Sequence, residues 1–483
     1  MASTLDLASG FGAPTEGAWL KLVEKTLKGA GPETLISRTR DGVEIAPLYR
    51  DGPAAPVRKT PADPARPWDL RASIRHPDPA RANSQILNDL QNGAASVLVK
   101  IDPKGLRGVA VGSEEGLSHV LNGVLLDIAP VALNAGYLGP EAADWLAALA
   151  KGGPEAPLAF HLDPLTAFAQ KGASPGPIES HILHAANTAV RLGRAYPRAS
   201  LFMASGRIAH EAGGTEAQEL AHAMACGLAY ARALIRAGAT PDQAFGGIVL
   251  GLSAGPEYFN TIAKLRAARV LWAKVAAASG ADASAPAKIE ARSSHRMLTA
   301  LDPWTNMLRL ASAAFGAGVG GADAIALGCF TDALDGEPTD FSRRQARNTQ
   351  LVLMEEAHIG RVADPAGGTW FLETLTDGMA RAAWAKFQAI EAAGGIIAAL
   401  EAGLVQNEIA QAAAAEIEAV RSKAREILGV TKFRNADTGQ LEVETVDGAR
   451  FAVAAPDPRK PGPDSACTPL KPVRLAEPFE GEA

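Results

Sequence analysis

The chain is poor in cysteine, poor in aromatic residues and free of long apolar runs. Its 483 residues include three cysteines, Cys226, Cys329 and Cys467, which lie far apart and form no Cys-x-x-Cys pair. This excludes a disulfide framework and a cysteine-based zinc site, so we expect three ordinary small hydrophobic residues in a reducing cytoplasm. No apolar run approaches the roughly 18–20 residues that a membrane span needs. The amino-terminal residues lack the basic and apolar regions of a secretory signal, so none is expected.

An excess of one charge is also lacking. The 47 Lys and Arg against 53 Asp and Glu give a formal net charge of −6, which provides no electrostatic footprint for nucleic acid. With 47% hydrophobic and 21% charged residues, the chain has the composition of a folded globular protein, which excludes global disorder and collagen-like sequence. The length suggests about three domains at roughly 150 residues each, although one large α/β barrel could take up most of it.

The two ends differ in composition from the middle. In residues 1–66 we expect a helix over Ala18–Lys28, a hairpin with its turn at Asp41-Gly42, and an extended proline-rich arm from Pro53 to Pro67. At the other end, residues 431–483 are polar and carry seven prolines after Ala455. Such a composition predicts a loosely ordered tail.

Between the ends, short runs rich in β-branched residues alternate with long helical stretches, among them Thr215–Ala237 and Pro256–Val275. Continuous apolar strands alternating with helices indicate a parallel sheet covered by helices, and eight such units predict a (β/α)8 TIM barrel over residues 67–376. An open doubly wound sheet is the alternative. Residues 377–430 follow as a helical region, broken at Gly394-Gly395 and Gly403. The predicted strands are Ser96–Ile101, Pro130–Gly136, Leu158–Asp163, Ser200–Ser205, Phe245–Ser253, Lys288–Ser294, Ala324–Phe330 and Gly360–Asp364.

Barrel enzymes carry their reactive groups at the carboxyl ends of the strands. His210-Glu211 is the best acid/base candidate there, because histidine titrates near neutrality and the carboxylate could orient it. The alternative is that both residues only begin a helix. Lys100 and Asp102 form either a pair at the barrel mouth or a solvated ion pair. Gly316–Gly321 fits Gly-x-Gly-x-x-Gly but follows a helix and precedes a strand, which indicates a helix C-cap and not a dinucleotide loop.

Several motifs together resemble those of the adenosylcobalamin-dependent acyl-CoA mutases, with methylmalonyl-CoA mutase as the type. The resemblance covers about residues 17–430 and implies a substrate barrel preceded by an arm that wraps a partner subunit. The segments that carry it are LVEKTLKG (22–29), DGVEIAPLY (41–49), RPWDLR (66–71), HEAGGTEAQEL (210–220), AKLRAARVLW (263–272), SRRQARNTQ (342–350) and DPAGGTWF (364–371).

This chain departs from the family pattern where the family's chemistry is expected. A Tyr-His pair that precedes Glu-Ala-Gly in the catalytic chains falls on Arg207 and Ile208, and isoleucine cannot hydrogen-bond a thioester carbonyl. The tyrosine expected two residues after Arg71 is Ser73. Residues 292–296 replace the family's polar turn after the sixth predicted strand, and residues 326–329 replace its polar run in the seventh. The segment that supplies a CoA-phosphate arginine in the family is not recognisable in this chain.

The family's cobalt-binding motif, Asp-x-His-x-x-Gly, also has no match. His210 and Gly213 have the His-x-x-Gly spacing, but Ile208 stands at the aspartate position and the segment lies within the barrel. The chain instead ends in its proline-rich tail where the family's cobalamin domain is expected to begin. The resemblance therefore places adenosylcobalamin on another chain.

These departures imply the small (beta), non-catalytic subunit of a heterodimeric, cytoplasmic methylmalonyl-CoA mutase. Its large partner would hold adenosylcobalamin and the acyl-CoA, and residues 1–66 would form the interface. No catalytic, cofactor-binding or metal-binding residue is then expected on this chain. Two alternatives remain: a substrate-binding subunit that works with a separate cobalamin-binding chain, and a repurposed barrel that uses His210 and Glu211.

Overall fold

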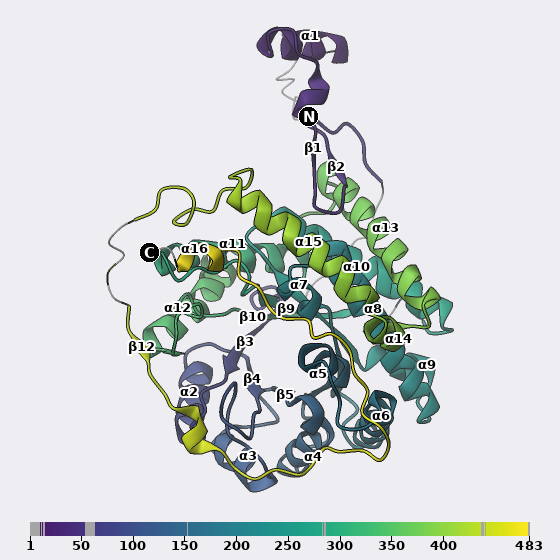
Figure 1. Cartoon of the computed structure of the whole chain (residues 1–483), viewed down its shortest axis with the longest axis vertical. Coiled ribbons are helices and arrows are strands. Elements are labelled where there is room, and N and C mark those ends of the chain that lie inside the picture. Colours follow the sequence, from purple (N-terminus) through teal and green to yellow (C-terminus); the bar gives the residue numbers. More distant parts are fainter. Residues whose placement is uncertain are drawn as a thin grey trace, which may run out of the picture.

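The computed structural model describes residues 10, 12, 15–53, 63–151, 153–282, 284, 286–435, 439 and 441–481. Its centre is a closed barrel of eight parallel strands, in the order β10-β3-β4-β5-β6-β7-β8-β9, surrounded by helices (Figure 1). The predicted (β/α)8 barrel is confirmed, and the open doubly wound sheet is wrong. The strands are β3 Asp69–Ile74, β4 Ser96–Lys100, β5 Val131–Asn134, β6 Ala159–Leu162, β7 Ser200–Ser205, β8 Ile248–Ala254, β9 Lys288–Ser293 and β10 Ala324–Ala326.

Seven of the predicted strands correspond to β4–β10, but the eighth prediction is wrong. Residues 360–364 form turns, and the missing strand is β3, which comes first in the chain. Its side chains alternate polar and apolar, so it lacks the continuous apolar run by which the other strands were found. Arg71 of β3 reaches Glu290 of β9, although β10 lies between the two strands. The polar face of β3 therefore points into the barrel.

The helices around the barrel follow the predicted alternation. Thr215 caps α8 in a capping box with Gln218, which explains why the sequence marked this helix start clearly. Gly321 ends α11 with φ +85°, so the Gly-rich segment is the expected helix C-cap. No helix in the described part of the chain combines the length and apolar character that crossing a bilayer takes. The helices around the barrel are α2 Pro79–Gln91, α3 Glu114–Val120, α4 Gly139–Leu149, α5 Pro164–Lys171, α6 Ile178–Ala195, α7 Arg207–Glu211, α8 Glu216–Arg236, α9 Pro241–Gly246, α10 Tyr258–Ala278, α11 Pro303–Gly320 and α12 Asp340–Leu351.

The helical region after the barrel consists of α13 Trp370–Ala392, α14 Ile396–Glu401 and α15 Leu404–Arg421. The predicted interruptions are confirmed, since Gly395 and Gly403 precede α14 and α15 with φ of +93° and +73°. Two oppositely charged pairs, Arg266–Asp364 and Arg266–Glu373, tie α10 to the start of α13. The helical region therefore packs on the barrel and is not an independent unit.

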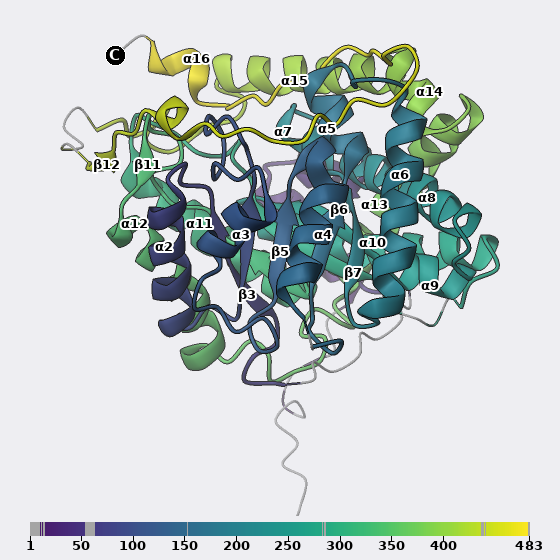
Figure 2. The ribbon, with the colours of Figure 1, turned by 90° about the horizontal axis from the view of Figure 1, so that it is seen from below.

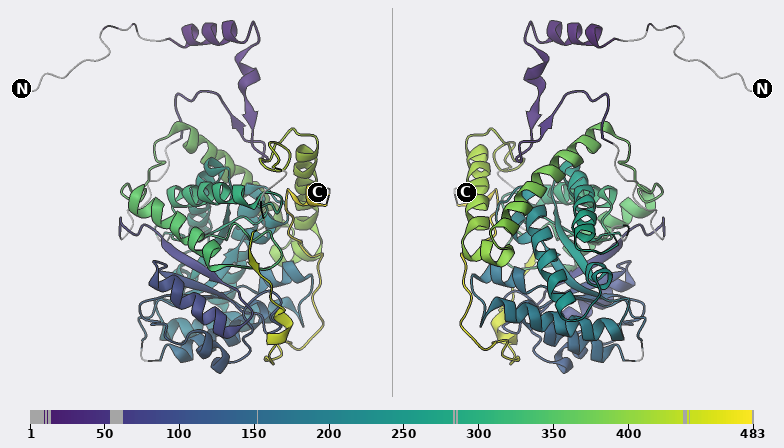
Figure 3. Two further views of the ribbon diagram at one scale, coloured as in Figure 1. Left: turned by 90° about the vertical axis from the view of Figure 1, so that its left-hand side faces the viewer. Right: turned by 90° about the vertical axis from the view of Figure 1, so that its right-hand side faces the viewer.

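The amino-terminal arm projects away from the barrel (Figure 3). It contains α1 Glu16–Thr26, a 3-10 turn Pro32–Leu35, and a hairpin of β1 Ser37–Arg38 and β2 Glu44–Ile45. The predicted helix and hairpin are confirmed, with Gly42 at φ +76° in the turn. Most of the predicted extended arm, residues 54–62, lies outside the described residues. The hairpin tip is anchored by Arg40, whose guanidinium donates to the carbonyl oxygens of Gly213 (2.7 Å) and Gly214 (3.1 Å).

The carboxyl-terminal segment 441–481, here called the strap, runs around the rim at the carboxyl ends of the barrel strands (Figure 2). It contains β12 Val443–Glu444, which pairs with β11 Glu337–Pro338, and α16 Glu477–Glu480. The prediction of a loosely ordered tail is wrong for these residues. The strap has little regular structure because its prolines prevent it, yet its main chain bonds to successive barrel loops: Val453 to Pro103, Cys467 to Gly172, Leu470 to Ala169, Val473 to Glu211 and Leu475 to Arg296.

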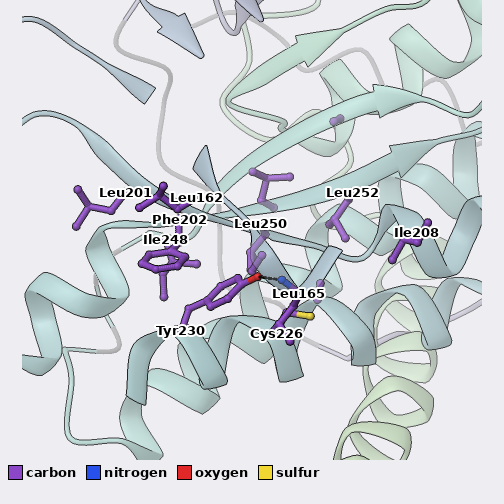
Figure 4. Close-up of a cluster of buried hydrophobic side chains, with 14 of the residues drawn as sticks. Leu162, Leu165, Leu201, Phe202, Ile208, Cys226, Tyr230, Ile248, Leu250 and Leu252 are labelled. Carbon is purple, nitrogen blue, oxygen red and sulfur yellow. Dashed lines mark hydrogen bonds between the residues drawn. The ribbon is translucent and has the colours of Figure 1, made fainter. Parts of the chain in front are cut away.

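The apolar core lies between the barrel wall and its helices (Figure 4). Phe202 of β7 and Tyr230 of α8 stack with ring centroids 4.5 Å apart, and both are completely buried. The Tyr230 hydroxyl donates to Asp163 (2.6 Å) and accepts from the Leu165 amide (2.9 Å). This contact fixes the start of α5 against α8 and so holds one side of the barrel rim.

Candidate functional site at the barrel mouth

The interior of the barrel is filled by a network of charged side chains. Arg71 lies 2.6 Å from Glu290 and 2.6 Å from Asp69, and its Nε donates to Ser96 (2.8 Å). Arg292 contacts the other oxygen of Glu290 at 2.6 Å. Burial alone would raise the pKa of Glu290, but Arg292 and Arg71 outweigh it and hold this pKa below its ordinary value. Glu290 escaped the sequence reasoning, because nothing in its local pattern distinguishes it from a strand residue.

His210 lies in a second buried network beside the barrel mouth. Its Nε2 is 2.7 Å from Ser294 Oγ, and its Nδ1 is 3.3 Å from Glu219 Oε2. Glu219 is also 2.6 Å from Lys264 Nζ and accepts the Ser253 amide (2.5 Å). Burial and the nearby Arg296 lower the pKa of His210, so its imidazole is neutral at neutral pH. Sequence reasoning found the histidine but missed Glu219, Lys264 and Ser294.

Glu211 does not orient His210, contrary to the expected acid/base pair. Its carboxylate accepts the main-chain amides of His295 and Arg296, both at 3.1 Å, and its carbonyl oxygen accepts the amide of Val473 from the strap. Ser294, His210 and Glu219 have the order of a nucleophile, a base and an orienting acid. However, Ser294 and His210 are each 2% exposed, so a substrate has no access to them in this structure and the arrangement holds the rim together.

Lys100 and Asp102 are not paired, so that expectation is wrong. The Asp102 carboxylate accepts the amides of Lys104 (3.1 Å), Leu106 (3.1 Å) and Arg107 (2.8 Å) and thereby shapes the loop after β4. Within the described residues, Lys100 Nζ has neither a hydrogen-bond acceptor nor a carboxylate within 4 Å. Burial, together with the positive charges of Arg75 and Arg107, lowers the pKa of Lys100 to about 8.

The three positions at which the sequence departs from the mutase pattern show different environments. Ile208 is 6% exposed and packs in the apolar core beside Leu252 (Figure 4). Arg207 keeps 22% of its side chain exposed, and its nearest carboxylate, on Glu211, is 3.7 Å away. Its Nε is buried without a hydrogen-bond partner, and burial together with Arg292 lowers its pKa to about 10. The carbonyl oxygen of Ser73 accepts a hydrogen bond from Arg343 (3.0 Å).

The comparison with known proteins decides the family. The sequence profile of methylmalonyl-CoA mutase matches residues 59–455, which is most of the chain and includes the whole barrel. The chain belongs to the methylmalonyl-CoA mutase family. Similar proteins include the methylmalonyl-CoA mutase small subunit of Streptomyces virginiae, 39% identical over 89% of this chain and 72% of that protein. The methylmalonyl-CoA mutase small subunit of Propionibacterium freudenreichii subsp. shermanii is 34% identical over 92% and 73%.

Some similar proteins are named methylmalonyl-CoA mutase without the words small subunit. The protein of Cereibacter sphaeroides named methylmalonyl-CoA mutase is 30% identical over 89% of this chain and 66% of its own length. The similarity over most of this chain therefore extends both to small subunits and to a protein named simply as a mutase.

The described residues do not fit the cobalt of adenosylcobalamin, the cofactor of this family. Cobalt ligation by histidine needs a free ring nitrogen, whereas both nitrogens of His210 face Ser294 and Glu219 inside the protein. No group of three or more His, Cys, Asp or Glu side chains in the described ranges is placed to hold a metal ion. The cysteines are free thiols, and burial raises the pKa of Cys329 to about 12, which keeps it protonated.

Proposed function

We propose that this chain is the small, non-catalytic subunit of a heterodimeric methylmalonyl-CoA mutase. Its large partner holds adenosylcobalamin and the acyl-CoA and interconverts methylmalonyl-CoA and succinyl-CoA by a radical 1,2-rearrangement. The observation that carries the proposal is the pair Arg207-Ile208 at the position where the resemblance places Tyr-His. Ile208 is part of the apolar core, so it offers no hydrogen bond to a substrate carbonyl.

The barrel interior supports the same conclusion. The carboxylate of Glu290 lies between the guanidinium groups of Arg71 and Arg292, which belong to strands β3 and β9. Their charges balance within the network, so the network is stable without a ligand. Placing a thioester there would require breaking buried ion pairs, which costs several kcal/mol per uncompensated charge. A scaffold role explains both the preserved barrel and the paired charges inside it.

The arm is the proposed interface with the large subunit. None of the α1 residues is buried, and Leu22 and Leu48 are 63% and 48% exposed. An isolated helix of this length is marginal in water, and exposed apolar side chains favour coverage by a partner. We assign residues 1–66 to this interface, 67–376 to the barrel, 377–430 to the helical region and 431–483 to the tail. A reducing cytoplasm suits the three free cysteines.

The proposal is tested by reconstitution. The chain is purified alone, its co-purifying partner is purified separately, and each is assayed for conversion of methylmalonyl-CoA to succinyl-CoA with added adenosylcobalamin. We expect no turnover by this chain, and full turnover only when a larger chain with the cobalt-binding motif is present. Turnover by this chain alone, or with only a small cobalamin-binding chain, would contradict the proposal.

A further inference from the structure

The outer helices of the barrel enclose a cavity of about 400 Å³. Its walls come from α8, α9, α10 and α13, and α13 packs against both α8 and α10. This volume lies within the range of about 300–1,000 Å³ that is typical of small-molecule binding sites. The cavity is therefore large enough for a whole small molecule.

The cavity lies toward the amino ends of the barrel strands, away from the strap. α8 and α10 follow the carboxyl ends of β7 and β8 and run back along the outside of the barrel. The residues that they contribute belong to their second halves, such as Ile235 of α8 and Ala278 of α10. Phe245 comes from α9, which directly precedes β8. In Figure 2 the strap runs along the top of the molecule and α9 lies well below it. The cavity is thus separate from the buried networks of the barrel mouth.

Aromatic and aliphatic side chains form the floor of the cavity. Phe245 and Phe387 are each 6% exposed, and Ala231 is 1% exposed. The ring centroids of Trp384 and Phe387 lie 5.2 Å apart, and those of Phe245 and Trp272 lie 4.9 Å apart. Tilted and edge-to-face contacts with such rings stabilise a further aromatic ring beyond the effect of its buried area. The floor therefore favours an aromatic ligand.

The polar groups around the cavity are already paired. Ser279 Oγ donates to the carbonyl oxygen of Val275 (2.9 Å). Arg232 Nη1 lies 2.9 Å from the Glu391 carboxylate, and these side chains are 52% and 22% exposed, so the pair stands at the edge of the cavity. Lys274, just outside, lies 4.1 Å from the centroid of a lining ring. Among the described residues, no side chain that lines the cavity has a buried nitrogen or oxygen without a hydrogen-bond partner. The cavity therefore offers a ligand apolar contact.

The cavity is open to solvent along one side. Ala278 is exposed and Ile235 is 37% exposed, and a Cβ added at Gly280 would meet no atom within 4 Å. A molecule can therefore enter without rearrangement of the core. Water in an apolar recess has few hydrogen-bond partners, so its displacement by an apolar group is favourable.

We propose that this cavity is a binding site for an uncharged aromatic small molecule. Its ring packs among Phe245, Trp384 and Phe387, and a polar substituent points to the open side, where the Arg232–Glu391 pair lies. A charged molecule is disfavoured, because it would lose hydration against the apolar floor and compete with that pair. The site uses no residue of the barrel mouth, the arm or the strap, so it goes beyond the scaffold role and does not depend on it.

The test is a calorimetric titration of the full chain with naphthylmethanol, an uncharged aromatic probe. We expect one saturable site, with binding at least about tenfold weaker in Ala278→Trp, whose larger side chain fills the open side. Ala277→Trp is the matched control, because Ala277 is the neighbouring exposed residue of α10 and does not line the cavity. Both chains should fold, which urea denaturation checks. Absence of saturable binding, or equal affinity in the two variants, would overturn the proposal.

The charge of the ligand is tested with naphthoate and naphthylmethylamine, which place a negative and a positive charge on the same ring system. We expect each to bind at least about tenfold more weakly than naphthylmethanol. Arg232→Gln should change the affinity for naphthylmethanol by no more than about twofold, as should Arg191→Gln, which removes an exposed arginine paired with Asp144 on other helices. Tighter binding of either charged probe would overturn the assignment of an uncharged ligand.

A last titration uses the chain together with its co-purifying partner. Because the cavity is assigned to a small molecule, we expect the affinity for naphthylmethanol to be the same in the complex as in the chain alone. Loss of binding in the complex would show that the partner covers the cavity and would overturn this assignment.

Discussion

Arg71 and Glu290 form a 2.6 Å ion pair inside the barrel, between strands 219 residues apart in the sequence. Arg292 contacts the same carboxylate and Arg71 also contacts Asp69, so two acids compensate two bases. The pair joins the first barrel strand to the seventh across β10, and it exists only when the barrel is closed. Glu290 is costly to remove, since Arg292 would lose its counter-charge and Arg71 would keep Asp69 alone.

We expect Glu290→Gln to lower the free energy of unfolding by about 3–5 kcal/mol, because Arg71 and Arg292 lose the buried carboxylate that they share. Urea denaturation followed by circular dichroism measures the change. Glu155→Gln is the control at an exposed position, where a change within about 0.5 kcal/mol is expected. A Glu290→Gln chain as stable as the original would show that the network does not stabilise the barrel.

The same carboxylate predicts how stability depends on acid. The pKa of Glu290 is lowered in the folded chain, so the unfolded chain binds the proton more readily. Its contribution to stability is present above the unfolded pKa, near the ordinary value of 4.5, and is lost as the pH falls below that value. The free energies of unfolding of the original chain and of Glu290→Gln should therefore approach each other as the pH is lowered from 7 to 3. A difference that stays constant over this range would contradict the prediction.

The burial of His222 predicts a second way in which acid lowers the stability of the folded chain. It is completely buried in α8 with no hydrogen-bond partner on either ring nitrogen, and burial lowers its pKa to about 4. The neutral ring is therefore preferred in the folded chain, and stability is lost as the pH falls from about 6.5. The free energy of unfolding of His222→Leu is compared with that of the original chain at each pH. We expect this difference to be about 3 kcal/mol more favourable to His222→Leu at pH 4 than at pH 7.5. His119→Leu, at an exposed position, should show no such change in urea titrations at the two pH values.

The burial of Leu470 predicts that apolar contacts help to hold the strap, together with its hydrogen bonds. Its side chain is 4% exposed and its amide bonds to Ala169. We expect Leu470→Asp to lower the free energy of opening of the strap by about 2–3 kcal/mol and so to speed hydrogen exchange over residues 465–475. Lys471→Asp, at the neighbouring exposed position, is the control. Unchanged exchange in Leu470→Asp would mean that this apolar contact does not hold the strap.

The exposed side chain of Leu22 indicates where the partner binds. It is 63% exposed on α1, which contributes nothing to the barrel core. We expect Leu22→Asp to reduce capture of the large subunit at least tenfold while the unfolding curve of the chain stays unchanged. Leu125→Asp replaces a leucine of similar exposure, 62%, on the barrel and should bind normally. Equal capture by both variants in a quantitative pull-down would place the interface elsewhere.

The buried, apolar position of Ile208 predicts that substitutions at positions 207 and 208 do not give this chain mutase activity. In Arg207→Tyr/Ile208→His the new imidazole enters an apolar cluster beside Leu252, where an unpaired polar group costs about 1–3 kcal/mol. We therefore expect a less stable chain with no mutase turnover in the presence of adenosylcobalamin. Detectable conversion of methylmalonyl-CoA would show that only these two residues separate the chain from a catalytic one.

Some elements could be predicted from the sequence because their signals are local. Strand β7 was predicted at its actual bounds, since an apolar run between turn residues is typical of a buried parallel strand. The start of α8 is marked by its capping box, and the interruptions before α14 and α15 by glycines that adopt positive φ. Each of these signals depends on residues within a few positions, so the fold class followed from their repetition.

Other features depend on contacts between distant segments. β3 was missed because its polar side chains are satisfied by partners on other strands, such as Glu290. The strap was mistaken for a loose tail because its order comes from bonds to barrel loops and not from its own composition.

The sequence by itself determined the alternation of strands and helices, the helix ends, and the residues that separate this chain from the catalytic pattern. Only the tertiary structure decided what those residues do. His210 was expected to pair with the adjacent Glu211 but faces Glu219, which is one turn into the next helix. Lys100 was expected to pair with Asp102 but lacks a counter-charge. The reason is physical: the charge state and reactivity of a side chain depend on burial and on the groups that surround it, and barrel closure brings those groups together from distant parts of the chain.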